Sequence, residues 1–121
     1  SAIFQARNGK TKSEIKDYIM KKYGYDLSKT CDEIRPTYHH VESCQETVPQ
    51  AITAFLEGGS FEEVIRLAVS LGGDSDTLTA IAGSIAEAYY PIPDNIKQRA
   101  LEILDDDLLE IYNKFIVCSA R

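Results

Sequence analysis

Helical periodicity is the sequence feature that most constrains the fold of this chain. In most segments the apolar residues recur three or four positions apart, a spacing that gathers them on one face of a helix. The segment 60–71 shows this pattern with Phe61, Val64, Ile65, Ala68 and Leu71. No segment alternates apolar and polar residues in the manner typical of a strand. The sequence therefore predicts an all-α fold whose helices are joined by short loops.

Capping signals indicate where several of these helices begin and end. Thr11 and Glu14 have the spacing of a capping box, and Gly24 follows the last periodic residue of that segment. Ser60 and Glu63 form a second pair with capping-box spacing. Two helix starts and one helix end are thus predicted at these positions.

The segment 37–46 has no periodicity and is predicted to be a loop, with a short helix ending before Pro36. Pro49 is expected in the first turn of the next helix, where a missing N–H is tolerated, and Gly58 is expected just past its end. Two amphipathic helices are predicted after Tyr90.

The stretch LAVSLGGDSDTLTAIAGSIAEAYY, residues 67–90, places polar chemistry in the most apolar part of the chain. Its second half predicts a helix whose remaining faces are mostly Ala, Gly and Ser, and therefore a helix buried nearly all round. Gly83 costs about 1 kcal/mol inside a helix. We expect the close approach of a neighbouring helix to offset that cost.

The charge balance excludes several classes of partner. The 121 residues include 13 Lys and Arg against 19 Asp and Glu, a formal net charge of −6. This composition offers no basic patch to displace counterions from nucleic acid. No apolar run reaches the roughly 18 residues of a membrane span. We therefore expect neither nucleic acid nor a membrane as a partner.

The length is typical of one domain, and a single all-helical domain is predicted over residues 1–121. Cys31, Cys44 and Cys118 are odd in number and form no CxxC pair, which favours reduced thiols and a cytoplasmic location. The chain begins at Ser1 without a methionine, and no signal peptide is visible. We expect it to be the later part of a longer protein.

Gly72 and Gly73 end one predicted helix, and Asp74 and Asp76 stand where the next begins. One interpretation is structural, because Asp is a favoured N-cap and first-turn carboxylates complement the helix dipole by about 0.3–1 kcal/mol. Capping needs one carboxylate, however, and two this close repel unless a cation lies between them. With Thr77 they form a set of hard oxygen donors suited to Mg²⁺, Mn²⁺ or Ca²⁺.

Two other motifs with paired aspartates fit less well. An EF-hand loop starting at Asp74 needs Gly at its sixth position and Glu at its twelfth, where this chain has Thr79 and Ile85. A haloacid-dehalogenase-like D-x-D-x-T start needs a preceding strand, and a threonine where Leu78 stands. Neither motif explains the stretch.

The sequence SLGGDSDTLTAIAGSIAEAYYPIP, residues 70–93, resembles the carboxy-terminal signature of the ADP-ribosylglycohydrolase family, which includes the dinitrogenase-reductase-activating glycohydrolases. That signature reads G-G-D-[STN]-D-[ST], then a small-residue helix and A-Y-Y-G; Pro91 replaces its last glycine here. The helix pair before it, residues 46–73, is similar as well. The resemblance implies an orthogonal helical bundle of which this chain is the carboxy-terminal part.

The resemblance also implies an activity, which is hydrolysis of the glycosidic bond that joins ADP-ribose to a protein side chain or a related acceptor. The expected partner is an ADP-ribosylated protein or an ADP-ribose-like small molecule. The family uses two Mg²⁺ or Mn²⁺ ions, and by position Asp74, Asp76 and Thr77 become metal ligands. The loop around Tyr38 lies where the family approaches the nucleotide, so Tyr38 is a candidate to stack on adenine as well as to pack.

Two family motifs that supply the other metal ligands, an early G-D-x-x-G segment and T-D-D-[ST], are absent from this chain. We therefore expect at most half of a dinuclear site and no activity from the chain alone, with the remainder in a longer protein or a partner chain. Missing helices would expose apolar faces and favour self-association into a homo-oligomer. The alternatives are a non-catalytic module of this family that binds a nucleotide or a protein, and a structural domain whose aspartates only cap.

Other chemistry-bearing residues favour ordinary roles. His39 and His40 could bind a metal together with Cys44, but adjacent side chains diverge, and exposed loop histidines are the favoured interpretation. The tyrosine pair 89–90 is expected to be part of the core. The acidic cluster 105–107 is expected to be a solvated helix start.

Overall fold

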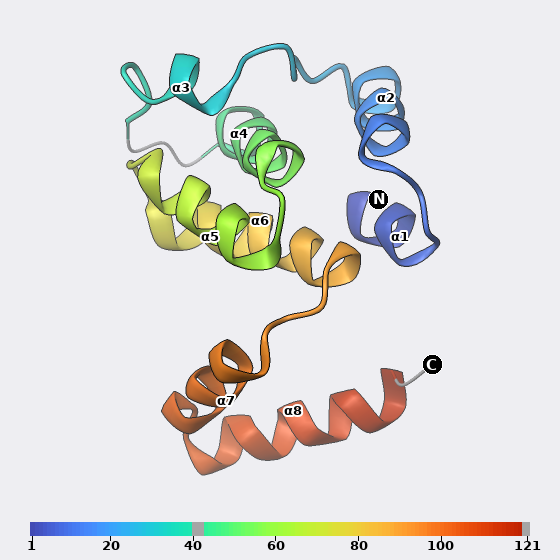
Figure 1. The fold of residues 1–121 in the computed structure, drawn as a ribbon, viewed down its shortest axis with the longest axis vertical. Coiled ribbons are helices and arrows are strands. Elements are labelled where there is room, and N and C mark those ends of the chain that lie inside the picture. The colour runs from blue at the N-terminus through green and yellow to red at the C-terminus, as the bar shows by residue number, and fades with distance from the viewer. Residues whose placement is uncertain (40–42, 120–121) are drawn as a thin grey trace. The chain divides into compact units, whose positions relative to one another are not determined.

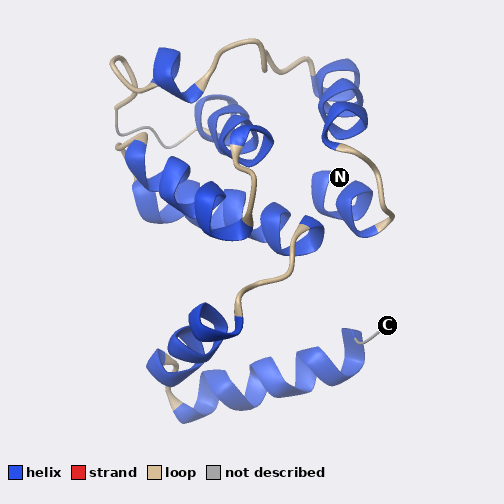
Figure 2. Cartoon of the chain, viewed as in Figure 1, coloured by secondary structure: helices blue, strands red, loops and turns tan. Residues whose placement is uncertain are grey.

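The computed structural model describes residues 1–39 and 43–119 of the chain. These residues form eight α-helices and no strand (Figures 1 and 2), which confirms the all-α prediction. The helices are α1 (Ala2–Arg7), α2 (Lys12–Tyr23), α3 (Cys31–Ile34), α4 (Cys44–Glu57), α5 (Phe61–Ser70), α6 (Ser75–Tyr89), α7 (Asp94–Ile103) and α8 (Asp106–Ser119).

The chain divides into two compact units, Ser1–Pro91 with α1 to α6 and Ile92–Arg121 with α7 and α8. In the first unit α6 contacts α1, α4 and α5, which makes it the central helix of that unit. One domain over 1–121 stays a prediction. Within the described ranges, no helix is both long enough and apolar enough to cross a membrane.

The core of the first unit forms where α4, α5 and α6 pack together. Its fully buried side chains include Phe55 of α4, Val64 of α5 and Leu78 of α6. Burying an apolar side chain of this size stabilises the fold by about 1.5–3 kcal/mol. A Cβ added to Gly83 would lie 3.0 Å from Cδ1 of Ile65. The predicted close approach at this glycine is therefore confirmed, with α5 as the neighbouring helix.

The prediction that α6 is buried nearly all round is wrong. Leu78, Ala82, Ile85 and Ala86 are buried, but Ala80, Ser84 and Glu87 are exposed. The reason is that α6 contacts other helices on part of its circumference, and its small residues extend beyond that part. A small-residue helix face is compatible with close packing but does not require it.

α4 begins earlier than predicted and places Pro49 in its interior. The helix starts at Cys44, and Pro49 is buried five residues further on. The hydroxyl of Ser43 donates to Oε2 of Glu46 at 3.0 Å, and Thr47 N donates to Ser43 O at 3.0 Å. These contacts form a first turn before the proline, within the segment expected to be a loop. Pro49 has no backbone N–H, so the helix lacks one hydrogen bond at this position.

The predicted caps are confirmed with one variation. Thr11 and Glu14 form a reciprocal capping box. The hydroxyl of Ser60 accepts from Glu63 N at 3.2 Å, as predicted. The Glu63 carboxylate, however, accepts from Gly59 N at 2.8 Å instead of from the N-cap residue itself. The box therefore extends over one more residue and stabilises the tight turn between α4 and α5.

Side chains of α2 and of the end of α6 meet at the carboxyl end of α4. The Lys12 ammonium of α2 donates to the carbonyl oxygen of Gly58, and the Tyr90 hydroxyl donates to the same oxygen at 2.9 Å. Nζ of Lys12 also lies 5.0 to 5.7 Å from the ring centroids of Phe55, Tyr89 and Tyr90. Tyr90 packs against the core, whereas Tyr89 is 36% exposed and is a core aromatic only in part.

The second unit has apolar residues but no interior among its described residues. No residue of α7 or α8 is buried. Ile103, Ile111, Phe115 and Val117 are each at least 60% exposed. These helices are amphipathic as predicted, and several of their apolar residues are exposed.

Replacing Gly58 by alanine should destabilise the chain by about 1–3 kcal/mol, the usual cost of overpacking. An added Cβ would lie 2.8 Å from Val64 N and 2.9 Å from Val64 Cα, which are backbone atoms that cannot turn aside. Gly59→Ala is the matched control, because its Cβ would meet only the flexible Glu63 carboxylate. Urea unfolding measures both variants, and equal stabilities would contradict the packing described.

Cys31 should resist alkylation while Cys44 and Cys118 react. Burial raises the pKa of the Cys31 thiol from 9.0 to about 12, and Glu57 adds to the shift. Its thiolate fraction at neutral pH is therefore about a thousandfold lower than that of an ordinary thiol. Mass spectrometry after iodoacetamide treatment should find two modified cysteines in the folded chain and three in urea. Labelling of Cys31 as fast as Cys44 in the folded chain would contradict its burial.

Candidate functional site

The turn between α5 and α6 positions the predicted aspartates. Gly72 and Gly73 have φ of 79° and 63°, the left-handed conformation that glycine adopts without strain. Two such residues in succession reverse the chain within four residues, between Ser70 and Ser75. The glycine pair thus places Asp74 at the N-cap of the central helix.

The two aspartates have different local roles. Asp74 is the N-cap residue and is half-buried, but its side chain makes no capping hydrogen bond. Asp76 lies in the first turn, is exposed, and accepts from Thr77 N at 2.9 Å through Oδ1. The carboxylate of Asp76 therefore satisfies a free N–H of the first turn, which is part of the capping function expected of Asp74. Thr77 is exposed beside it.

Tyr38 lies against this turn although it is far away in sequence. A Cβ added to Gly73 would lie 2.7 Å from Cε2 of Tyr38 and 2.8 Å from the carbonyl oxygen of His39. Glycine is therefore required at position 73 for the space it leaves as well as for its conformation. The structure brings together Tyr38 and the start of α6, two parts of the predicted site.

The environment of Tyr38 disfavours its ionised form. Burial raises the pKa of the Tyr38 hydroxyl, the carboxylates of Asp74 and Glu46 add to the shift, and the Thr47 hydroxyl opposes it. The Tyr38 oxygen is enclosed and has no hydrogen-bond partner of normal geometry among the described residues. Tyr38 therefore combines a ring packed against the core with an unsatisfied donor.

Glu46 is a residue near the candidate site that the sequence analysis missed. Its carboxylate acts on the same tyrosine hydroxyl as Asp74 does, so it faces the same region. The signal in the sequence was the spacing of Ser43 and Glu46, the same serine-to-glutamate spacing as in a capping box. The lack of periodicity predicts a loop there, and a loop assignment gives no role to Glu46.

The remaining candidates stay outside this site or outside the described residues. His39 is exposed, and its Nδ1 lies 3.3 Å from the carbonyl oxygen of Thr37, while His40 falls outside the described residues. Asp105 accepts from Leu108 N at 2.9 Å through Oδ1, so the acidic cluster marks a helix start as predicted.

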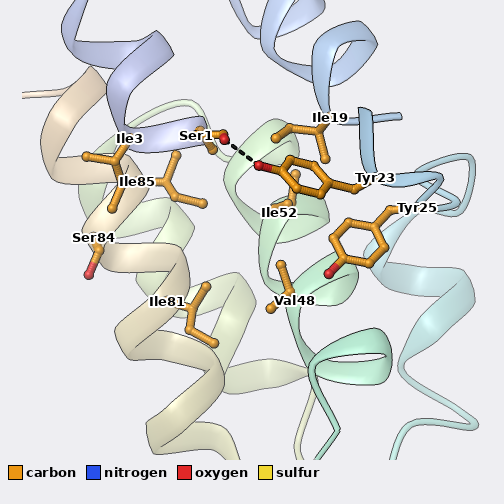
Figure 3. A pocket seen from close by; sticks show the side chains of 11 residues that line it. Ser1, Ile3, Ile19, Tyr23, Tyr25, Val48, Ile52, Ile81, Ser84 and Ile85 are labelled. Carbon is orange, nitrogen blue, oxygen red and sulfur yellow. Dashed lines mark hydrogen bonds between the residues drawn. The ribbon is translucent and has the colours of Figure 1, made fainter. Parts of the chain in front are cut away.

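An apolar pocket of about 350 Å³ lies elsewhere in the first unit (Figure 3). The rings of Tyr23 and Tyr25 line one side of it, and Ile81 and Ile85 of α6 line the other. The hydroxyls of Ser1 and Tyr23 are hydrogen bonded at its edge. No carboxylate is among the described residues that line this pocket, so its described lining differs in chemistry from the turn that carries the aspartates.

The chain is all-helical, and two aspartates stand where its central helix begins. It matches the model of the ADP-ribosylglycohydrolase family over residues 2–119. The chain belongs to this family. That finding confirms the resemblance seen in the G-G-D-S-D-T signature.

Individual relatives match over shorter segments. The chain is 35% identical over 69 residues to ADP-ribosylhydrolase ARH3 of Homo sapiens, covering 54% of this chain and 18% of that protein. It is 35% identical over 80 residues to an uncharacterized protein of Archaeoglobus fulgidus, covering 61% of this chain and 26% of that protein. These matches thus span 18% to 26% of the length of the two relatives. No solved structure matches significantly.

Alanine substitution should destabilise the chain less at Gly72 than at Gly73. Gly72→Ala faces open space and should lose about 1–2 kcal/mol, the cost of the left-handed conformation. Gly73→Ala bears the same cost and also collides with Tyr38, so it should lose at least about 1 kcal/mol more. Chemical denaturation of both variants measures the difference. Equal losses would show that the Tyr38 segment does not pack on Gly73.

Proposed function

We propose that this chain forms part of a metal-dependent hydrolase that cleaves the glycosidic bond between ADP-ribose and a protein side chain or a related acceptor. The observation that carries the proposal is the family match over residues 2–119, which includes the aspartate pair at the start of α6. The name of the human relative, an ADP-ribosylhydrolase, supports the same reaction class.

The donor chemistry of the turn fits Mg²⁺ or Mn²⁺ in part. Asp74, Asp76 and Thr77 present hard oxygen donors at the start of α6. Among the residues described, no three His, Cys, Asp or Glu side chains gather closely enough to hold a metal ion. This chain would thus supply some of the ligands, and a further segment or chain would supply the others.

In this proposal each residue of the turn has a defined task. Asp74, Asp76 and Thr77 would hold the metal, which when bound orients the substrate and lowers the pKa of a water molecule. A cation at a helix N-terminus opposes the positive end of the dipole, and two carboxylates there offset that cost. Gly72 and Gly73 hold both carboxylates at one end of a rigid helix.

Tyr38 is the proposed contact for the substrate, an ADP-ribosylated protein or an ADP-ribose-like small molecule. Its ring lies against Gly73, next to Asp74, and burial raises the pKa of its hydroxyl. An aromatic ring offers a stacking surface. This property suits a nucleotide held beside the metal.

Mn²⁺ should broaden the amide NMR signals of residues 74–78 in the full chain, because the metal is paramagnetic and carboxylates bind it. Asp74→Asn and Asp76→Asn should each weaken this binding about tenfold or more. Asp106→Asn is the matched control, since it removes an exposed first-turn carboxylate from a different helix, α8. It should leave the broadening at residues 74–78 unchanged.

Broadening that is absent, or that survives both substitutions, would refute the metal-ligand assignment and favour aspartates that only cap. The hydrolase assignment has a separate test, since the chain alone is expected to be inactive. Adding a family segment that carries the T-D-D-[ST] motif should restore release of ADP-ribose from an ADP-ribosylated protein. Release that is unaffected by Asp76→Asn would count against the proposed role of this turn.

A further inference from the structure

A cavity of about 290 Å³ lined by lysines lies in the first unit, between α2, the loop before α3 and the carboxyl end of α4. Lys12 and Lys16 line it from one face of α2, since they are one helical turn apart. Lys29 lines it from the loop. The hydroxyl of Ser13 adds a hydrogen-bond donor to the same lining, whereas the Thr30 hydroxyl donates to Oε1 of Glu33 at 3.3 Å. The described lining thus holds three lysines, in a chain of net charge −6.

The positive charge of this cavity is only partly neutralised by the protein. The Lys12 ammonium donates hydrogen bonds to the carbonyl oxygens of Leu56 and Gly58. Lys16 and Lys29 form no ion pair or hydrogen bond with the part of the chain that the structure describes.

The negative groups near this cavity are already engaged with the protein. Glu57 is the one carboxylate in its described lining, and Oε2 of Glu57 accepts from Cys31 N. Asp26, on the same loop as Lys29, accepts from both the amide and the hydroxyl of Ser28, and these bonds lower its pKa, with Lys29 adding to the shift. Two lysines therefore remain to meet the charge of a ligand.

We propose that this cavity binds a small phosphate-bearing anion through Lys16 and Lys29. An ammonium group is a flexible point charge that suits phosphate oxygens, and two such groups meet the charge of a phosphate monoester near neutral pH. The hydroxyl of Ser13 would complete the set of donors. The volume exceeds that of a few water molecules, so the phosphate and part of its substituent fit inside.

The cavity is distinct from the proposed metal site. The Tyr90 hydroxyl joins the end of α6 to Gly58 at the end of α4, where the lysines lie. Tyr38 joins the beginning of α6 to the segment that precedes α4. The two sites therefore lie at opposite ends of α6, whose 15 residues span about 22 Å at 1.5 Å per residue. Failure of one proposal leaves the other standing.

Titration of the full chain with inorganic phosphate, followed by amide NMR at low ionic strength, tests the proposal. Saturable shifts are expected at Ser13 and at residues 28–30. The double variant Lys16→Gln/Lys29→Gln should weaken binding by at least about tenfold, because two charge contacts are lost. A second titration with ADP distinguishes the source. Equal affinities read from the shifts of residues 28–30 assign free phosphate as the ligand, and tighter binding of ADP at these residues assigns a nucleotide.

Lys21→Gln/Lys97→Gln is the control, because it removes the same charge from two exposed lysines outside the cavity. It should leave the phosphate affinity within about twofold of the unchanged chain. If both double variants lose phosphate affinity equally, the binding is general electrostatic attraction to the chain, and the proposal is overturned. The absence of saturable shifts at residues 28–30 would overturn it as well. Circular dichroism checks folding, and Lys29→Gln alone replaces the double variant if that variant unfolds.

Discussion

The close packing at Gly58 is the constraint on which the rest of the first unit depends. Its carbonyl oxygen receives the Lys12 ammonium and the Tyr90 hydroxyl, so one backbone group ties α2 and the end of α6 to α4. Its Cα lies against the backbone of Val64, which leaves no room for a side chain. Because α4, α5 and α6 meet at this point, their relative placement is set here, and the position of the opposite end of α6 follows from it.

The candidate site lies at that opposite end of α6. The glycine pair Gly72 and Gly73 sets the geometry of the site. Gly72 and Gly73 turn the chain so that Asp74 becomes an N-cap, and the missing side chain at position 73 admits Tyr38. The same turn thus sets both the acidic group and the aromatic group. Family membership gives this arrangement a chemical context, since the signature residues fall on the turn and the first turn of α6.

Much of this could be predicted from the sequence, because helical period and capping chemistry are local. Thr11, Glu14 and Gly83 behave as their sequence contexts indicate. The start of α4 could not be predicted in this way, because Pro49 is tolerated there after a turn formed by side chains of the preceding residues. The contact of Tyr38 with Gly73 could not be predicted from local sequence patterns either, because it depends on tertiary packing. Metal ligation by the aspartates stays a prediction.

The exposed apolar residues of α7 and α8 affect the local stability of these two helices in solution. A helix pair with no buried residue among those described gains little from tertiary burial, so each helix depends largely on its own backbone hydrogen bonds. Its amide hydrogens exchange with solvent through local fraying, whereas those of α4 to α6 require the core to open. Proteolytic cleavage therefore begins beyond Pro91, and a resistant fragment close to the first unit accumulates.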